Sequence, residues 1–225
     1  MVTALNEDNI KREIENELRN ADLFTTTQRN VTTTTQNYTA TAGQTVFTLT
    51  NEPRNIRSVT VASVAKYYFL DYEFDAVAKT LTLYTGATLN DAVAIQYDYG
   101  TTGGGGDKIY PDFPREDLSL SSFPRIGFQI ISIKTDPISL GATSYMSDIV
   151  VSFKITVPAD KISSVGGVTY LETLKRSLRT ALLTRQTSFK LFKYIKPTFT
   201  SPNIPGANNK IISKIEDYMI RFLVE

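Results

Sequence analysis

Apolar and polar residues alternate along the chain between positions 42 and 99. The alternating runs cover 42–49, 58–61, 70–74, 80–84 and 92–97. Strict alternation is typical of half-buried β-strands, so this region is predicted to be a small all-β unit. A threonine-rich segment precedes it and four glycines, Gly103–Gly106, follow it. These compositions predict linkers over 25–36 and 101–107, which make 37–100 an inserted β-module.

Two segments outside this module have the apolar spacing of helices. Ile10, Ile14 and Leu18 recur every four residues within 6–21 and form one narrow stripe, whose opposite face is charged. The helix is therefore expected to pack by one side only. Thr169 and Glu172 form a capping box before leucines at 171, 174, 178 and 182, which predicts a second helix ending near 185.

The same part of the chain also has strand patterns. Strands are predicted at 126–133, which is apolar on both faces and hence central, and at 147–157 and 189–195. The C-terminus fits two patterns, a helix on the spacing of Ile211 and Ile215 or a strand over 216–224, and the strand is favoured. These elements predict an α+β fold: a small antiparallel sheet with two helices on one face, formed by 1–24 and 108–225, plus the inserted all-β module.

Composition excludes several kinds of chemistry. The 225 residues include no cysteine, histidine or tryptophan. Disulfides, Ser-His-Asp or Cys-His catalysis and most transition-metal sites are therefore excluded. No apolar run is long enough to span a bilayer, and no secretory signal pattern opens the chain, so synthesis in the cytoplasm and no membrane partner are expected.

The net charge is only +1, but the charges are unevenly distributed. No acidic residue occurs from Thr173 to Ile215. The predicted interaction residues in this basic window are Lys175, Arg176, Arg179, Arg185, Lys190, Lys193 and Lys196. They indicate contact with DNA phosphates or with an acidic protein. The alternative is an ordinary basic surface whose acidic partners come from elsewhere in the fold.

Three other segments, two acidic and one glycine-rich, are interpreted as structural rather than as binding or catalytic sites. Asp71, Glu73 and Asp75 share one face of a strand, as a calcium site or, the favoured reading, as a solvated acidic edge. The glycines at 103–106 lack the strand and helix of a phosphate loop. The acids at 107, 112, 116 and 117 crowd a loop with no partner base. No catalytic, cofactor or metal site is predicted, and the tyrosines of the module are assigned mainly to its core.

Two resemblances add to this picture. Ala42-Gly43-Gln44-Thr45-Val46-Phe47, Asp71-Tyr72 and Val93-Ala94-Ile95-Gln96-Tyr97 resemble a β-module that recurs in virion proteins of tailed bacterial viruses. The segments Phe123-Pro124-Arg125-Ile126, Ser147–Phe153, Tyr170-Leu171-Glu172 and Asp217–Phe222 are similar to those of phage tail terminator, or tail completion, proteins. This second likeness covers 5–21 and 108–225.

The terminator resemblance implies a non-enzymatic virion protein. It implies a homo-oligomeric ring, a hexamer by family resemblance, at the head–tail junction. Tail tube and neck proteins are the implied partners, with transient contact with passing DNA. A baseplate or tail-fibre adaptor is the alternative, and a carboxylate-based glycosidase and a DNA-binding regulator are less favoured, because no placed acid pair and no helix-turn-helix pattern is present.

Subunits are expected to join through edge strands, whose unpaired backbone groups accept a further strand. The candidates are the C-terminal strand and the strand at 189–195. The predicted interface residues are Tyr218, Ile220, Phe222 and Val224.

Overall fold

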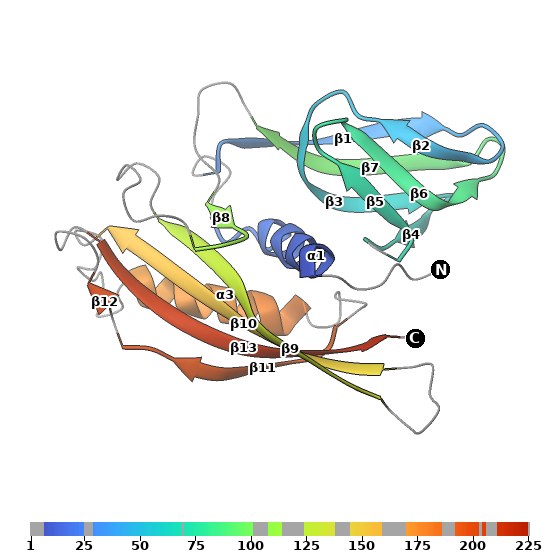
Figure 1. The fold of residues 1–225 in the computed structure, drawn as a ribbon. Helices are drawn as coiled ribbons and strands as arrows, with labels where there is room; N and C mark the ends of the chain where they lie inside the picture. Colours follow the sequence, from blue (N-terminus) through green and yellow to red (C-terminus); the bar gives the residue numbers. More distant parts are fainter. Residues whose placement is uncertain are drawn as a thin grey trace. The chain divides into compact units, whose positions relative to one another are not determined.

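A computed structural model describes residues 7–24, 29–68, 70–100, 108–113, 124–137, 145–158, 170–185, 192–202, 204–205 and 211–224. The chain divides into two compact units, Met1–Gly105 and Gly106–Glu225 (Figure 1). None of the described helices is long and apolar enough to cross a membrane.

The described part of the first unit combines the helix α1 (Glu7–Asn20) with two β-sheets. The first sheet has the order β1 (Val31–Thr39), β7 (Ala92–Gly100), β3 (Pro53–Val61), β4 (Val64–Lys66). The second has the order β2 (Gln44–Thr48), β6 (Thr80–Ala87), β5 (Tyr72–Asp75). All of these neighbours within the sheets are antiparallel.

The core of this unit contains the alternating apolar residues that the sequence identified. Phe47, Leu81, Leu83, Ile95 and Tyr97 are among its buried members. Side chains at every second position point to one face of a strand, so each sheet presents one apolar face to this core. The expectation for the tyrosines is confirmed for Tyr68, Tyr72 and Tyr97, which are buried there, whereas Tyr67 and Tyr84 are exposed.

The predicted linker at 25–36 is wrong from residue 31 onward. Val31–Thr39 forms strand β1, which pairs with β7 at all nine of its positions. Threonine is β-branched and fits a half-exposed pleated surface, so a threonine run that cannot build a core can still complete the edge of a sheet. The second predicted linker, 101–107, lies outside the described residues.

Helix α1 attaches to strand β3 through asparagine side chains. Asn16 Oδ1 accepts a hydrogen bond from the Ile56 amide at 2.9 Å, and Asn20 Nδ2 donates to the Ile56 carbonyl at 2.8 Å. Strand β4 pairs with β3 only at Val59–Val61, so the helix supplies partners where β3 has no neighbouring strand on that side. Both asparagines are buried, and the expectation of one-sided packing through the isoleucine–leucine stripe is therefore wrong.

A buried charge cluster lies beside this contact. Asp98 is 0% exposed, and its Oδ1 accepts from Arg57 Nε at 2.7 Å and from Thr33 at 2.6 Å. Arg57 and Arg29 both also reach Asp22 Oδ1 at 2.7 Å. These hydrogen bonds connect Asp22, which follows α1, to strands β1, β3 and β7. Burial of a carboxylate is costly unless it is paired, and these contacts supply the partners of Asp98.

The second unit contains one long antiparallel sheet. Its order is β11 (Phe192–Thr200), β13 (Ile211–Val224), β10 (Tyr145–Pro158), β9 (Arg125–Pro137), β8 (Ile109–Tyr110), and β12 (Ile204–Pro205) also pairs with β13. Only β8 runs parallel to its neighbour. Helix α3 (Tyr170–Arg185) begins next to the predicted capping box, although Thr169 itself lies outside the described residues.

Helix α3 lies against one face of this sheet. Its leucines at 171, 174, 178 and 182 are buried. Glu172 forms an ion pair with Lys214 of β13, and Lys214 is the cross-strand partner of Ile155 in β10. Cross-strand partners share a face, so α3 covers the face that carries Phe153, Ile155 and Tyr218.

The predicted α+β fold class is wrong, because the chain is mostly β. The described residues hold just two helices, α1 and α3, against the three sheets. Strands β9, β10 and β13 have 13 or 14 residues each, longer than their apolar cores predicted, because cross-strand pairing extends through polar positions as well. The grouping of 1–24 with 108–225 also differs from the observed division, which assigns α1 to the first unit.

Candidate assembly surface

The far end of strand β9 is exposed on both of its faces. Every residue from Ile131 to Asp136 is solvent-exposed. Ile131 is 57% and Ile133 is 45% exposed, and Met146 in the paired part of β10 is 36% exposed. We call residues 131–137 of β9, together with residues 145–147 of β10 that pair with 135–137, the arm; in Figure 1 these ends of β9 and β10 run side by side.

A bulge marks the beginning of the arm. Val151 pairs with Ile130 and Val150 pairs with Ser132, so Ile131 is an extra residue in β9. A bulge bends its strand and increases the local twist, and it re-aims the side chains beyond it. Apolar side chains on such a two-sided exposed strand are typical of a contact with another protein.

Strand β9 is also an edge over most of its length. Strand β8 pairs with it at Ile126 and Gly127 alone, so within the described residues Phe128–Pro137 has β10 as its one strand neighbour. The prediction of a central strand is therefore correct only for its first residues. The sequence signal misled because apolar residues on both faces of a strand do not establish that a strand lies on each side of it.

The predicted interface strand at the C-terminus is wrong. Strand β13 lies inside the sheet, between β10 on one side and β11 with β12 on the other. Tyr218 and Ile220 are 0% exposed. Phe222 and Val224 belong to the same internal strand, and their side chains lie outside the described residues. An internal strand has its backbone groups paired on both sides and cannot accept another strand.

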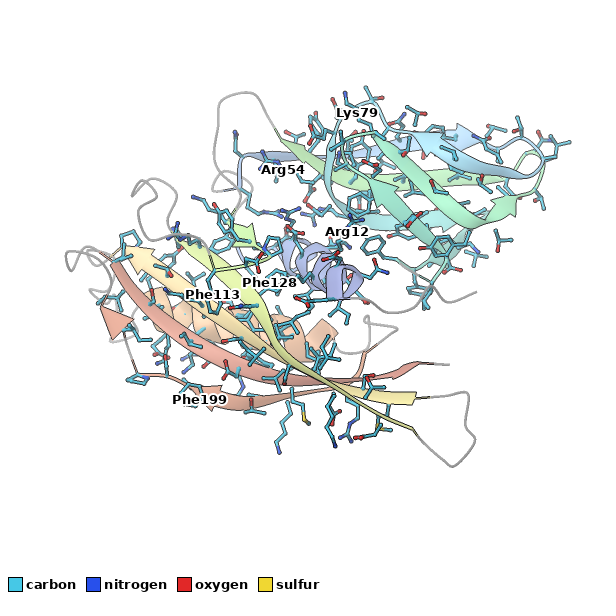
Figure 2. All side chains as sticks on the ribbon, viewed as in Figure 1. Arg12, Arg54, Lys79, Phe113, Phe128 and Phe199 are labelled. Carbon is cyan, nitrogen blue, oxygen red and sulfur yellow. The ribbon has the colours of Figure 1, made fainter. Side chains whose placement is uncertain are left out.

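The second predicted interface strand, at 189–195, overlaps β11, an edge strand that is poorly suited to pairing with another strand. Strand β11 is the outermost strand on its side of the sheet. It contains Pro197, two register shifts and the exposed Lys196, all of which discourage addition of another strand. Phe199 on this strand is 52% exposed (Figure 2).

The basic window gains acidic neighbours in the folded chain. Lys175 is 3.0 Å from Glu172 and 4.0 Å from Glu216, residues that flank the window in sequence. The hydrogen bond from Lys214, together with Lys175, lowers the pKa of Glu172 below its ordinary value. Arg176, Arg179 and Lys196 are exposed, whereas the side chains of Arg185, Lys190 and Lys193 lie outside the described residues. The structure therefore places three of the seven predicted residues on the surface.

The acidic candidates do not form a metal site. Asp71 accepts a hydrogen bond from the Tyr67 amide at 2.8 Å, and Asp75 accepts one from the Ala78 amide at 2.9 Å, so both cap local turns. Within the described part of the chain, no cluster of three or more carboxylates could hold a metal ion. Strand β5, which carries Glu73 and Asp75, is an edge strand, as the favoured interpretation required. Of the loop acids, only Asp112 is among the described residues.

One buried acid has no counterpart in the sequence predictions. Glu13 on α1 is 5% exposed, and burial, with a smaller contribution from Glu17, raises its pKa well above the ordinary value. The sequence placed this residue on the charged, solvated side of the helix. No pattern in the sequence distinguishes it from its exposed neighbours.

Comparison with models of known protein families gives no match for this chain, and comparison with curated proteins gives none.

Proposed function

We propose that this protein is a structural virion protein of a tailed phage, a ring-forming tail terminator or connector subunit at the head–tail junction. The observation that carries the proposal is the exposed arm. Ile131 and Ile133 are large apolar side chains on a strand that the rest of its unit leaves uncovered. Their burial requires another protein surface.

The segments that resemble tail terminators support the proposal by their positions. Arg125-Ile126 begins β9, Ser147–Phe153 lies in β10, and Asp217–Phe222 lies in β13. These are three successive strands of one sheet, and Tyr170-Leu171-Glu172 begins the helix that covers it. The part of the resemblance within 108–225 therefore falls on one sheet and its covering helix, whereas the part within 5–21 belongs to the first unit.

The mechanism of such a subunit is geometric. An arm that contacts a different surface of the next subunit makes a head-to-tail interface, and a rotation that closes gives a ring. A closed ring caps the end of the tail tube, stops its growth and presents the opposite surface to the neck proteins.

The exposed arginines of α3 would serve a second contact. Arg176 and Arg179 are one turn apart on α3, and Lys175, which precedes Arg176 in sequence, pairs with Glu172. A pair of exposed guanidinium groups suits DNA phosphates or an acidic protein surface. We assign this contact to Arg176 and Arg179 and exclude Lys175 from it.

The test is the mass of the protein in solution. Native mass spectrometry and light scattering of the full chain are expected to give one discrete ring mass. The double variant Ile131→Asp and Ile133→Asp should give a smaller species with an unchanged circular dichroism spectrum, because both side chains are exposed and the fold does not depend on them. The matched control is Val77→Asp, since Val77 is a branched apolar residue that is 87% exposed in the other unit.

The ring proposal fails if the arm variant keeps the native mass, or if the native protein is a monomer. The alternative function, a baseplate or tail-fibre adaptor, is favoured by the presence of two compact units in one chain, one for each attachment. A trimeric native mass would support the adaptor and contradict the ring.

A further inference from the structure

Strand β1 is a second unpaired edge, and it lies in the first unit. Its nine residues are one valine, five threonines, one glutamine, one asparagine and one tyrosine, with no charge and no proline. Its register with β7 is unbroken from Val31–Gly100 to Thr39–Ala92. Within the described residues, β7 is its only strand neighbour.

The other sheet edges of the described chain are protected against further pairing. Strands β4 and β8 have three and two residues, β5 has two acids among its four residues, and β2 contains a register shift. Strand β9 carries Lys134 and Asp136, and β11 carries Lys196 and Pro197. Asn16 and Asn20 occupy the open side of β3. Short length, charge, proline, bulges and cover are the usual means of protecting an edge, and β1 has none of them.

We propose that β1 pairs antiparallel with β1 of a second copy of this chain. The two-fold axis passes near Thr35, the middle residue of the strand, and the two four-stranded sheets become one continuous sheet. The contact is isologous, so each copy supplies the same strand.

The side chains of β1 are compatible with self-pairing in this register. Thr35 faces Thr35 of the second copy, and Asn37 faces its Thr33. In this register the central residues Thr33, Thr35 and Asn37, which are all exposed, lie opposite one another. Hydroxyl and amide side chains directly opposite one another can form hydrogen bonds, and no like charges meet.

The occupant is a second copy because the edge is complementary to itself. An uncharged strand has no charged side chain with which to recognise a different protein. Two identical threonine-rich strands can pair their backbone groups and place hydroxyl groups opposite one another. This contact is separate from the proposed ring, because the arm belongs to the second unit and β1 to the first. The arm variant and the β1 variants therefore test different interfaces in the same full-length chain.

Cysteine substitution measures the register directly, since the chain contains no cysteine. Directly opposite residues in an antiparallel pair have Cα atoms about 4.5–5.5 Å apart, within the range of a disulfide. Thr35→Cys is expected to form a disulfide-linked dimer on mild oxidation at low micromolar concentration. Asn37→Cys should not, because the two copies of residue 37 would lie about 13 Å apart along the strands. Ser58→Cys, exposed on β3, which β7 separates from β1, controls for random collision.

A charge exchange tests the same axis without a covalent bond. Thr35→Lys places two ammonium groups opposite each other and should weaken the dimer by roughly tenfold or more, as should Thr35→Glu. An equimolar mixture of the two variants should restore the dimer as a heterodimer. Ser58→Lys is the matched control and should leave the mass unchanged.

Three results would overturn the proposal. One is a Thr35→Cys cross-linking yield no higher than that of Ser58→Cys. Another is equal cross-linking of Thr35→Cys and Asn37→Cys, which would indicate that the two β1 strands pair in parallel. The third is a Thr35→Lys variant with native mass, which would leave the edge to a different protein or to no partner.

Discussion

Two local features set the units of this protein apart: a buried charge cluster around Asp98 in the first unit and the exposed arm in the second. The first unit buries polar groups: Asp98 and Asn55 are at most 1% exposed, and hydrogen bonds satisfy both side chains. The second unit exposes apolar groups, with Ile131 and Ile133 about half exposed on the arm. In the described residues, the first unit encloses its core between two facing sheets, whereas helix α3 covers one face of the sheet of the second unit.

This difference separates groups that stabilise the fold from groups that contribute little to it. A buried, fully paired carboxylate contributes to one particular arrangement of strands, and disrupting the pairing is costly. An exposed isoleucine contributes little to the isolated fold and gains when a partner covers it. The cluster around Asp98 is therefore expected to matter for the stability of the first unit, whereas the arm residues are expected to matter little for the isolated fold.

The largest expected effect comes from removing the buried charge. Asp98→Asn leaves Arg57 and Arg29 without their shared buried counter-charge and should lower the free energy of unfolding of the first unit by about 3–5 kcal/mol. Hydrogen-exchange mass spectrometry should show lost protection in β1, β3 and β7. The control is Asp91→Asn at an exposed turn, and equal protection in both variants would contradict the assigned role.

The same cluster predicts a pH dependence. Burial alone would raise the pKa of Asp98, but hydrogen bonds from Arg57 and Thr33 outweigh it and hold that pKa below its ordinary value. Hydrogen bonding to Arg57 likewise lowers the pKa of Asp22. A carboxyl group whose pKa is lower in the folded state than in the unfolded state stabilises the fold when the pH is above its unfolded-state pKa, near 4. This stabilisation is lost as the pH falls through the folded-state pKa. Asp98→Asn should flatten the acid limb of the stability profile.

The next effect tests whether the second unit depends on its helix. Leu178→Ala removes a side chain of α3 that is 0% exposed and should destabilise this unit by about 2–5 kcal/mol. Hydrogen exchange should accelerate in β10 and β13 while the strands of the first unit keep their protection. Leu183→Ala is the matched control, because Leu183 is 40% exposed on the same helix. Loss of protection in both units would show that they unfold together and would contradict the separate stability of the two units.

The smallest effect sharpens the account of the polar contact in the first unit. Asn16→Ala leaves the Ile56 amide without its acceptor and should cost about 1–3 kcal/mol. Exchange of this single amide, measured by nuclear magnetic resonance, should accelerate more than that of other β3 amides. Lys11→Ala on the same helix serves as the control, and an unchanged Ile56 rate would exclude the proposed edge cover.

The sequence identified local elements well where one pattern dominated. The alternating runs from 44 to 97 all form strands, α3 follows its leucines, and the ambiguous C-terminus is a strand as favoured. Side-chain alternation and helical spacing follow from backbone geometry, which each segment carries by itself. The threonines of β1 were misjudged because they have no apolar face, and their pairing with β7 depends on a partner more than fifty positions away.

The position of each element within its sheet could be settled only by the tertiary structure. The alternation in β13 would suit an edge strand as well as an internal one, and the strand is internal because pairing on its second side depends on which strand comes next in space. Glu13 and Asp98 look like surface acids in the sequence and are buried in the fold. The sequence determined which residues can form strands and helices, whereas long-range pairing decided which edges, charges and apolar side chains remain available to a partner.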